Sequence, residues 1–421
     1  MIRHTRVQHA VGQGFFSSAD IASSAGGTLR YVYDCGAMGK FRVALDARIQ
    51  SYLDSLDKAA KLDFLFISHA HFDHVSGLSK LLDTANGGVQ VDTVIMPLMD
   101  VYDRLIVFAT AALEDRETAR DSFYQSFVAD PVEAIQRFNP RRILLMRRGN
   151  GPDGDGLPGG DGSGEPGPPL GESAFPVKLA GSGAVEQRDV TQSGTELMVV
   201  PDTKWLALGV EDVTWLLSPF VDPTVNADRS KFRAMLAHEL MMSVRSLGQW
   251  LRSPGNRIDL LTNKLVSLEK AYKAVKSNIN ITSMCLFSGP LPEPGRLSVD
   301  HHWIAGKFGG REIGGNIAWL ATGDAALAQN GRRRAMLKHY RHLLPSVLTL
   351  TLPHHGATAN YHDDLVRLVD PHFCVASADY YHRRWQHPGA KVVHSVASHG
   401  SLLFTVTAAT VSELREFAFL R

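Results

Sequence analysis

The chain of 421 residues has few cysteines, almost no net charge and no long apolar run. Its three cysteines, Cys35, Cys285 and Cys374, are too few for a disulfide framework, so a reducing compartment is expected. Lys and Arg total 44 against 43 Asp and Glu, and the net charge of +1 gives no overall attraction to nucleic acid or membranes. Because runs of about 18 apolar residues and a signal-peptide core are both absent, we expect a cytoplasmic protein without a membrane partner.

One segment is very poor in apolar residues. Residues 149–172 contain 10 Gly and 5 Pro, and no Lys, Arg or aromatic residue. Such a composition cannot bury enough apolar surface to offset the entropy of ordering the chain. We therefore predict a flexible, disordered Gly/Pro-rich loop over residues 149–183, inserted into a single domain that spans residues 1–421.

Elsewhere, 44% of the residues are hydrophobic and short apolar runs alternate with helical patterns. Strands alternating with helices predict an α/β fold. The predicted strands are 31–34, 64–67, 93–96, 317–321, 347–352, 373–376 and 402–406. The predicted helical stretches are 103–138, 228–251, 259–275 and 331–344, and two of these regions, 103–138 and 225–276, are interpreted as helical insertions.

The main chemical signal follows the predicted strand 64–67. The sequence there reads Ser-His-Ala-His-Phe-Asp-His, ending at His74. Residues two apart in an extended chain point the same way, so His69 and His71 can face one metal ion. Asp73 and His74 follow after the chain turns and can reach a second ion. Imidazole and carboxylate groups are the usual ligands of a catalytic divalent metal.

Three further pieces follow later predicted strands. Asp324 closes the strand 317–321 after a Gly that permits close approach, and it is suited to bridging two metals. His354 and His355 close the strand 347–352, and one of them can supply an imidazole to the second metal. His387 precedes a Pro and is expected to line the cleft.

This order of pieces resembles the metallo-β-lactamase fold superfamily. The resemblance is carried by H-x-H-x-D-H at 69–74, by Thr-Gly-Asp at 322–324, by His-His-Gly at 354–356 and by the early Asp34. Together with the His-Pro at 387–388, these motifs are most similar to the branch that contains the nuclease-like domain of the competence DNA-uptake channel. Many members place another metal-binding His between the first motif and the bridging Asp. Here that interval holds only His238, His301 and His302.

The resemblance implies a four-layer αββα sandwich and a dinuclear hydrolase. Two divalent ions, zinc above all, with manganese or iron also compatible, would hold a bridging hydroxide. The implied ligands are His69 and His71 for the first ion, Asp73, His74 and His355 or His354 for the second, and Asp324 as the bridge. Asp73, His387 and Tyr380 are the expected catalytic residues, and Asp34 is expected to accept a hydrogen bond from a ligand imidazole.

Phosphodiesters are the expected substrates, which makes the protein a nuclease or phosphodiesterase. Two basic runs support this expectation, although each also fits a solvated face: Arg332, Arg333, Arg334, Lys338 and Arg341, and Arg137, Arg141, Arg142, Arg147 and Arg148. Thioesters, lactones or lactams are alternative substrates. A further alternative is a non-catalytic, metal-stabilised module that binds a protein partner through its helical insertions.

Overall fold

The computed structural model describes residues 1–148, 173–188, 194–222, 226–275, 282–291, 298–313, 315–379 and 385–421. Its strands form two sheets, of eleven and eight strands. The first has the order β14 (Phe308–Ile313), β13 (Val299–Ala305), β19 (Leu414–Leu420), β1 (Ile2–Gln8), β2 (Gly14–Ser23), β3 (Thr28–Ala37), β4 (Lys61–Phe66), β5 (Gln90–Pro97), β6 (Arg142–Arg147), β9 (Glu196–Pro201) and β8 (Glu186–Arg188). The second has the order β18 (Leu402–Val406), β17 (Phe373–Ser377), β16 (Val347–Thr351), β15 (Ala318–Ala321), β12 (Ser283–Pro290), β11 (Val213–Asp222), β10 (Lys204–Val210) and β7 (Val177–Gly181).

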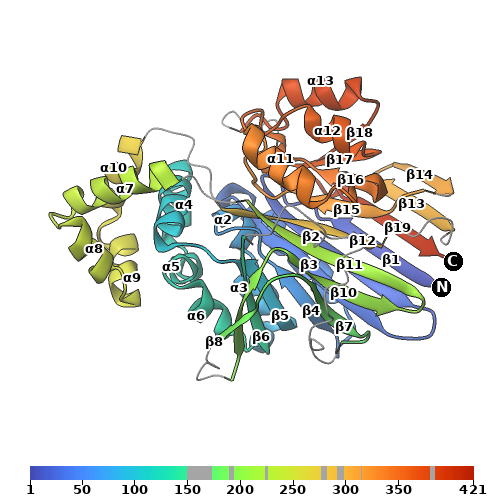
Figure 1. The fold of residues 1–421 in the computed structure, drawn as a ribbon, viewed down its shortest axis with the longest axis horizontal. Helices are drawn as coiled ribbons and strands as arrows, with labels where there is room; N and C mark the ends of the chain where they lie inside the picture. Colours follow the sequence, from blue (N-terminus) through green and yellow to red (C-terminus); the bar gives the residue numbers. More distant parts are fainter. Residues whose placement is uncertain are drawn as a thin grey trace.

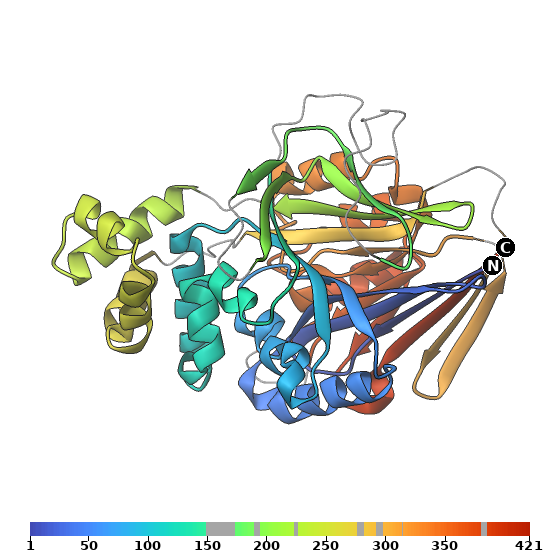
Figure 2. The same ribbon diagram turned by 90° about the horizontal axis from the view of Figure 1, so that it is seen from below.

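Helices cover both outer faces of this pair of sheets (Figures 1 and 2). Those over the first sheet include η1 (Gly39–Phe41), α1 (Arg42–Asp54), α2 (Phe72–Val75), α3 (Leu78–Leu82), α4 (Val101–Glu114), η3 (Thr118–Arg120), α5 (Ser122–Ala129) and α6 (Pro131–Gln136). The second sheet packs against α11 (Asn330–His339), α12 (Asp364–Val369) and α13 (Ala390–Ser398). Short 3-10 turns in the described part of the chain include η2 (Thr84–Asn86), η4 (Leu344–Ser346), η5 (Pro353–Gly356) and η6 (Thr410–Ser412).

The four layers follow from the period of two along the strands. In β3, Tyr31 and Tyr33 point between the two sheets, whereas Val32 points toward the helices. Successive side chains of a strand face opposite sides, so a continuous apolar run supplies two cores at once. The α/β class and the four-layer sandwich predicted from the sequence are therefore confirmed.

The two predicted helical regions lie next to each other. Residues 226–275 form α7 (Asn226–Glu239), α8 (Val244–Trp250), α9 (Pro254–Thr262) and α10 (Leu265–Val275). Figure 1 shows these four helices beside α4 at one end of the sandwich. No helix in the described part of the chain has both the length and the apolar character needed to cross a membrane.

Two boundaries differ from the sequence expectation. The stretch 103–138 is broken into separate helices because Asp121 and Asp130 cap new helix starts, each accepting a hydrogen bond from a backbone N–H. The predicted loop 149–183 ends earlier than expected, since β7 pairs with β10 and buries Val177 and Leu179. Residues 149–172 lie outside the described residues.

A buried ion pair joins both ends of the chain to the second sheet. Arg6 of β1 donates to Glu416 of β19, with Arg6 Nε 3.1 Å from Glu416 Oε2. The other oxygen of Glu416 accepts from the Thr349 hydroxyl of β16 at 2.6 Å. The Arg6 guanidinium also lies over the Trp319 ring of β15, 5.2 Å from its centroid. This cluster therefore ties the first sheet to the second through side chains far apart in sequence.

The Glu416 carboxylate makes stability depend on acid pH. Burial opposes its charged form, but Arg6 and His301 outweigh burial and lower its pKa from 4.5 to about 2. The stabilisation is complete above the ordinary pKa and is lost as pH falls from about 4.5 to about 2, a total of roughly 3 kcal/mol. Urea unfolding over this pH range would measure the free energy of unfolding of the wild type and of Glu416→Gln. The difference between the two is expected to become smaller as the pH falls. A gap independent of pH would contradict this assignment.

Candidate metal centre

The predicted ligands lie at the carboxyl ends of parallel strands from both sheets. In the first sheet, β3 and β4 are parallel, and His69 follows β4 by three residues. In the second, β15, β16 and β17 are parallel, so Asp324 after β15 and His355 after β16 come to the same edge. Parallel pairing therefore brings together residues that are separated by more than 250 positions.

The described residues contain two groups with the arrangement of metal ligands. One group is His69, His74 and Asp324, and the other is Asp73, His74 and His355. His69 Nε2 lies 3.4 Å from Asp324 Oδ2, and His74 Nε2 lies 3.3 Å from Asp324 Oδ1. His355 Nε2 lies 3.1 Å from Asp73 Oδ2. Because His74 is common to both groups, the two groups form one continuous cluster.

Three ligand atoms of this cluster are buried without a hydrogen-bond partner among the described residues. They are His69 Nε2, His74 Nε2 and Asp324 Oδ1. Burying unpaired polar atoms costs free energy unless a partner or an ion satisfies them. Nitrogen and carboxylate oxygen donors suit zinc, manganese or iron. The residues present therefore fit divalent metal ions.

Asp34 and Ser68 orient His69 and His74. Asp34 accepts hydrogen bonds from the Ser68 backbone N–H and hydroxyl, both at 2.6 Å, and from His74 Nδ1 at 2.7 Å. Since the Ser68 hydroxyl gives its proton to Asp34, it accepts from His69 Nδ1 at 3.0 Å. His355 Nδ1 donates to the Ser377 carbonyl at 2.8 Å. All three imidazoles therefore turn Nε2 toward the cluster.

Charge in the cluster is balanced between carboxylates and imidazoles. Burial opposes ionisation of Asp73 and Asp324, but neighbouring histidines hold the pKa of each carboxyl well below its usual range. Burial also opposes protonation of His74, yet Asp324, Asp34 and Asp73 raise its pKa well above 6.5. The pKa of His69 is lowered by burial and by the charge of His74. The cluster is thus anionic at its oxygen atoms, as a cation site requires.

Residues in the left-handed region of backbone conformation shape the two turns that carry Asp324 and His355. Gly323 has φ +51°, and a Cβ there would lie 2.6 Å from the Ser283 Oγ that accepts from the Asp324 N–H. His354 and His355 also have positive φ, of 49° and 58°. The tight turns place Asp324 and His355 against the ends of their strands.

The other predicted site residues lie around the cluster rather than inside the two groups. His71 Nδ1 hydrogen-bonds Asp73 Oδ1. His354 is 42% exposed, with Nε2 3.8 Å from Asp324 Oδ2. The His387 ring is partly buried, 6.5 Å from the His355 ring, and burial together with the charges of His355 and His354 lowers its pKa to about 3. Tyr380 lies outside the described residues.

Glu114 is a residue near the site that the sequence did not suggest. It is the last residue of α4, and its Oε2 lies 3.6 Å from His71 Nε2. No motif marks it, because the residue lies 40 positions beyond the His-Asp segment in an ordinary helix.

The two basic runs are divided between the surface and the fold, since Arg137, Arg148, Arg334, Lys338 and Arg341 are exposed. Most of their side chains have partners within the fold. Arg332 pairs with buried Asp222 at 3.0 Å and Arg333 with Asp364 at 3.1 Å. The partners in the other run are Asp92 for Arg141, Glu196 for Arg142, Glu186 for Arg147, the Phe123 ring for Arg137 and the Phe220 ring for Arg148. The arginines that pair with carboxylates stabilise the fold, and they give no support to a nucleic-acid groove.

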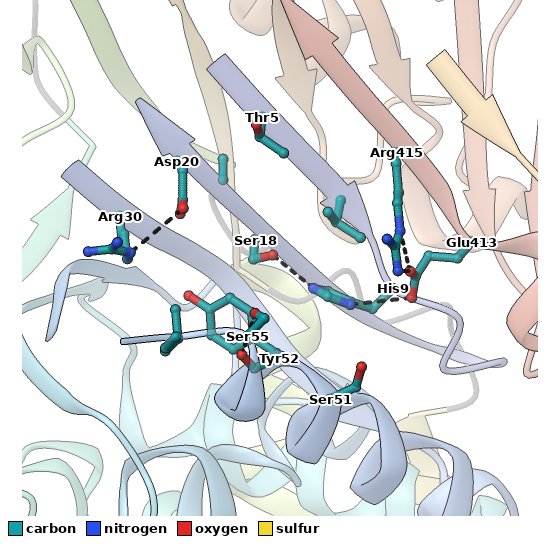
Figure 3. A pocket seen from close by; sticks show the side chains of 13 residues that line it. Thr5, His9, Ser18, Asp20, Arg30, Ser51, Tyr52, Ser55, Glu413 and Arg415 are labelled. Atoms are coloured by element: carbon teal, nitrogen blue, oxygen red, sulfur yellow. Dashed lines mark hydrogen bonds and ion pairs between the residues drawn. The ribbon is translucent and has the colours of Figure 1, made fainter. Parts of the chain in front are cut away.

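A separate hollow of about 340 Å³ lies on the outer face of the first sheet, beside α1. Figure 3 shows His9 between Ser18 and Glu413, with His9 Nε2 2.8 Å from Ser18 Oγ and His9 Nδ1 3.5 Å from Glu413 Oε2. None of the predicted metal ligands lines this hollow. It is therefore distinct from the candidate metal centre.

Comparisons with known proteins agree with this geometry. Residues 24–99, which include Asp34 and the motif 69–74, match the family described as the metallo-beta-lactamase superfamily. No curated protein matches the chain.

Two solved structures are similar to the chain at low scores. A long form RNase Z from yeast is 8% identical with a TM-score of 0.30, over 83% of this chain and 32% of that one. A beta-lactamase domain protein from Burkholderia ambifaria is 17% identical with a TM-score of 0.21, over 42% of this chain and 44% of that one. The matched part thus spans less than half of either structure, and neither likeness bears on activity. Residues 24–99 thus match the metallo-beta-lactamase superfamily, and the two-sheet sandwich that contains them is consistent with this match.

Proposed function

We propose that the protein is a cytoplasmic, dinuclear metal-dependent hydrolase that cleaves phosphodiesters, as a nuclease or phosphodiesterase. One observation carries the proposal: two ligand groups share His74, and three of their ligand atoms are buried without a hydrogen-bond partner among the described residues. A cluster used only for structure would be expected to satisfy its own polar atoms.

The two oxygens of Asp324 support its assignment as the bridge. Oδ2 lies near His69, whereas Oδ1 lies 3.3 Å from His74 Nε2 and 4.0 Å from His355 Nε2. One carboxylate therefore faces both groups. We assign His69 and His71 to the first ion, and Asp73, His74 and His355 to the second. His355 is preferred to His354 because it is buried and its Nδ1 is held by Ser377.

When bound, two divalent ions would lower the pKa of water and neutralise charge developing on phosphoryl oxygens. The chain's own residues would position the substrate around them. His354 is exposed at the edge of the cluster and can donate to a phosphate oxygen. His387, whose pKa is lowered to about 3, is neutral at physiological pH and can hydrogen-bond the leaving group. Asp73 and Tyr380 complete the proposed catalytic set.

The phosphodiester assignment rests on the paired metal groups and on the resemblance of the His-His-Gly and His-Pro motifs to the competence-nuclease branch. Two-metal sites suit in-line displacement at phosphorus, because the ions can stabilise the attacking and leaving oxygens. The paired arginines contribute nothing to this choice. Binding of a protein partner through the helical insertions, 103–138 and 225–276, remains part of the proposal.

The test combines metal analysis with a substrate panel. Purified protein is expected to hold about two ions per chain and to cleave bis-p-nitrophenyl phosphate and single-stranded oligonucleotides. His355→Ala should abolish cleavage, whereas the matched control His238→Ala, on an 80% exposed side chain of α7, should retain it. Cleavage of thioesters or lactones alone would overturn the substrate class. Two ions without turnover on any substrate would favour a binding module.

A further inference from the structure

Three histidines of the candidate metal centre are held by the same kind of hydrogen bond. In His69, His74 and His355, Nδ1 is held by Ser68, Asp34 and the Ser377 carbonyl, respectively. Only Nε2 then faces the cluster. Holding one ring nitrogen fixes the tautomer and the ring plane, so the other nitrogen is ready as a ligand.

His71 is turned the other way. Its Nδ1 faces Asp73 Oδ1 inside the cluster, and its Nε2 points to Glu114 Oε2 at 3.6 Å. His71 is buried and Glu114 is partly buried, with side-chain exposures of 8% and 24%. Shortening this separation by about 0.5 Å would bring it into the hydrogen-bond range. Glu114 thus lies beside the ring nitrogen of His71 that faces away from Asp73, as Asp34 lies beside Nδ1 of His74, but at a longer distance.

We propose that Glu114 is a positioning residue of the metal centre: it accepts a hydrogen bond from His71 Nε2–H and leaves the Nδ1 lone pair for the first ion. The inference rests on the proposed function and assigns a role that no motif in the chain encodes. A carboxylate behind an imidazole also increases the basicity of the ligand nitrogen.

The arrangement matters because the first ion has few other protein ligands. The three histidines between the first motif and Asp324 lie elsewhere. His238 is exposed on α7, and His301 and His302 lie on β13, near Glu416 and Asp300. In the assignment proposed above, the first ion is held by His69, His71 and Asp324, so the orientation of His71 has a large influence on its affinity.

The position of Glu114 is fixed by neighbouring helices. Two residues after Glu114, Arg116 forms two hydrogen bonds with the buried carboxylate of Glu269 in α10. At the other end of α4, Asp103 pairs with Arg229 of α7 at 2.7 Å. The helices at 226–275 thereby hold α4, and α4 holds Glu114 against the metal centre.

The test compares Glu114→Ala, Glu114→Gln and the control Glu117→Ala in the full chain. Glu117 lies three residues away, is 70% exposed and pairs with Arg120. Chelator competition with zinc should show one ion bound about 10- to 100-fold more weakly in Glu114→Ala, with the second ion unchanged. Glu114→Gln keeps an acceptor but not the charge, so it should fall between Glu114→Ala and the wild type. Glu117→Ala should match the wild type.

A spectroscopic measurement separates positioning from a general structural role. In zinc-loaded protein labelled with ¹⁵N-histidine, His71 should carry its proton on Nε2, and His69, His74 and His355 on Nδ1. In Glu114→Ala, the signal of the His71 Nε2 proton should be lost through exchange with water. The Nδ1 proton signals of His69, His74 and His355 should remain. Wild-type zinc affinity with an unchanged His71 signal in Glu114→Ala would overturn this inference alone. A wild type that binds no metal would overturn the proposed function as well.

Discussion

Asp324→Asn is expected to lower kcat/KM for phosphodiester cleavage by about 10³-fold or more and to reduce the metal content below two ions per chain. Asparagine keeps the volume of the side chain but removes the charge and one of the two oxygens that face the ligand groups. The backbone should stay in place, because the Asp324 N–H donates to Ser283 Oγ independently of the side chain. Steady-state kinetics and elemental analysis of the same sample would measure both effects.

The control for this variant is Asp259→Asn. Asp259 lies on α9 and pairs with Lys264, away from the metal centre. The Asp259→Asn protein should keep wild-type turnover and metal content. The bridging role would be refuted by an Asp324→Asn protein that is folded by circular dichroism, holds two ions and turns over within a few-fold of the wild type.

Glu416→Gln is expected to lower the free energy of unfolding by about 3–5 kcal/mol. The substitution leaves the Arg6 guanidinium, which is 3% exposed, without its charged partner inside the sandwich. It also weakens the link from Thr349 of the second sheet. A buried charge that has lost its partner costs far more than a surface ion pair gains. Urea unfolding at neutral pH, read by tryptophan fluorescence, would measure the loss.

Asp300→Asn provides the matched comparison in the same sheet. Asp300 pairs with Arg311 across β13 and β14, where the Arg311 side chain is 56% exposed. Breaking this surface pair should cost less than about 1 kcal/mol. Equal losses of unfolding free energy in Glu416→Gln and Asp300→Asn would contradict this prediction. They would show that burial does not increase the contribution of the Arg6–Glu416 pair to stability.

The sequence was most informative where the signal is local. The seven predicted strands all lie within observed strands or extend past them by one residue, because each is a short apolar run with its own boundary residues. Asp73, His74, Asp324 and His355 could be named because each follows such a strand. Strands β1 and β19 were missed, since their buried positions include Arg6 and Glu416, which read as solvent-facing residues.

Partners distant in sequence could not be found this way. Arg332 reads as part of a basic surface until Asp222, 110 residues earlier, is seen beside it. Glu114 reads as an ordinary helical residue until α4 packs near His71. Which nitrogen of each imidazole faces the candidate metal centre is likewise set by groups such as Ser377, 22 residues from His355.

Short segments of the chain thus predict the layered α/β class and the order of the candidate ligands after the strands, because periodicity and strand-end residues are encoded locally. The folded chain was needed to show which candidate ligands share a group, which imidazole nitrogen each presents and which charges are neutralised inside the fold. Those outcomes depend on contacts between segments that only the packing of the two sheets and their helices brings together.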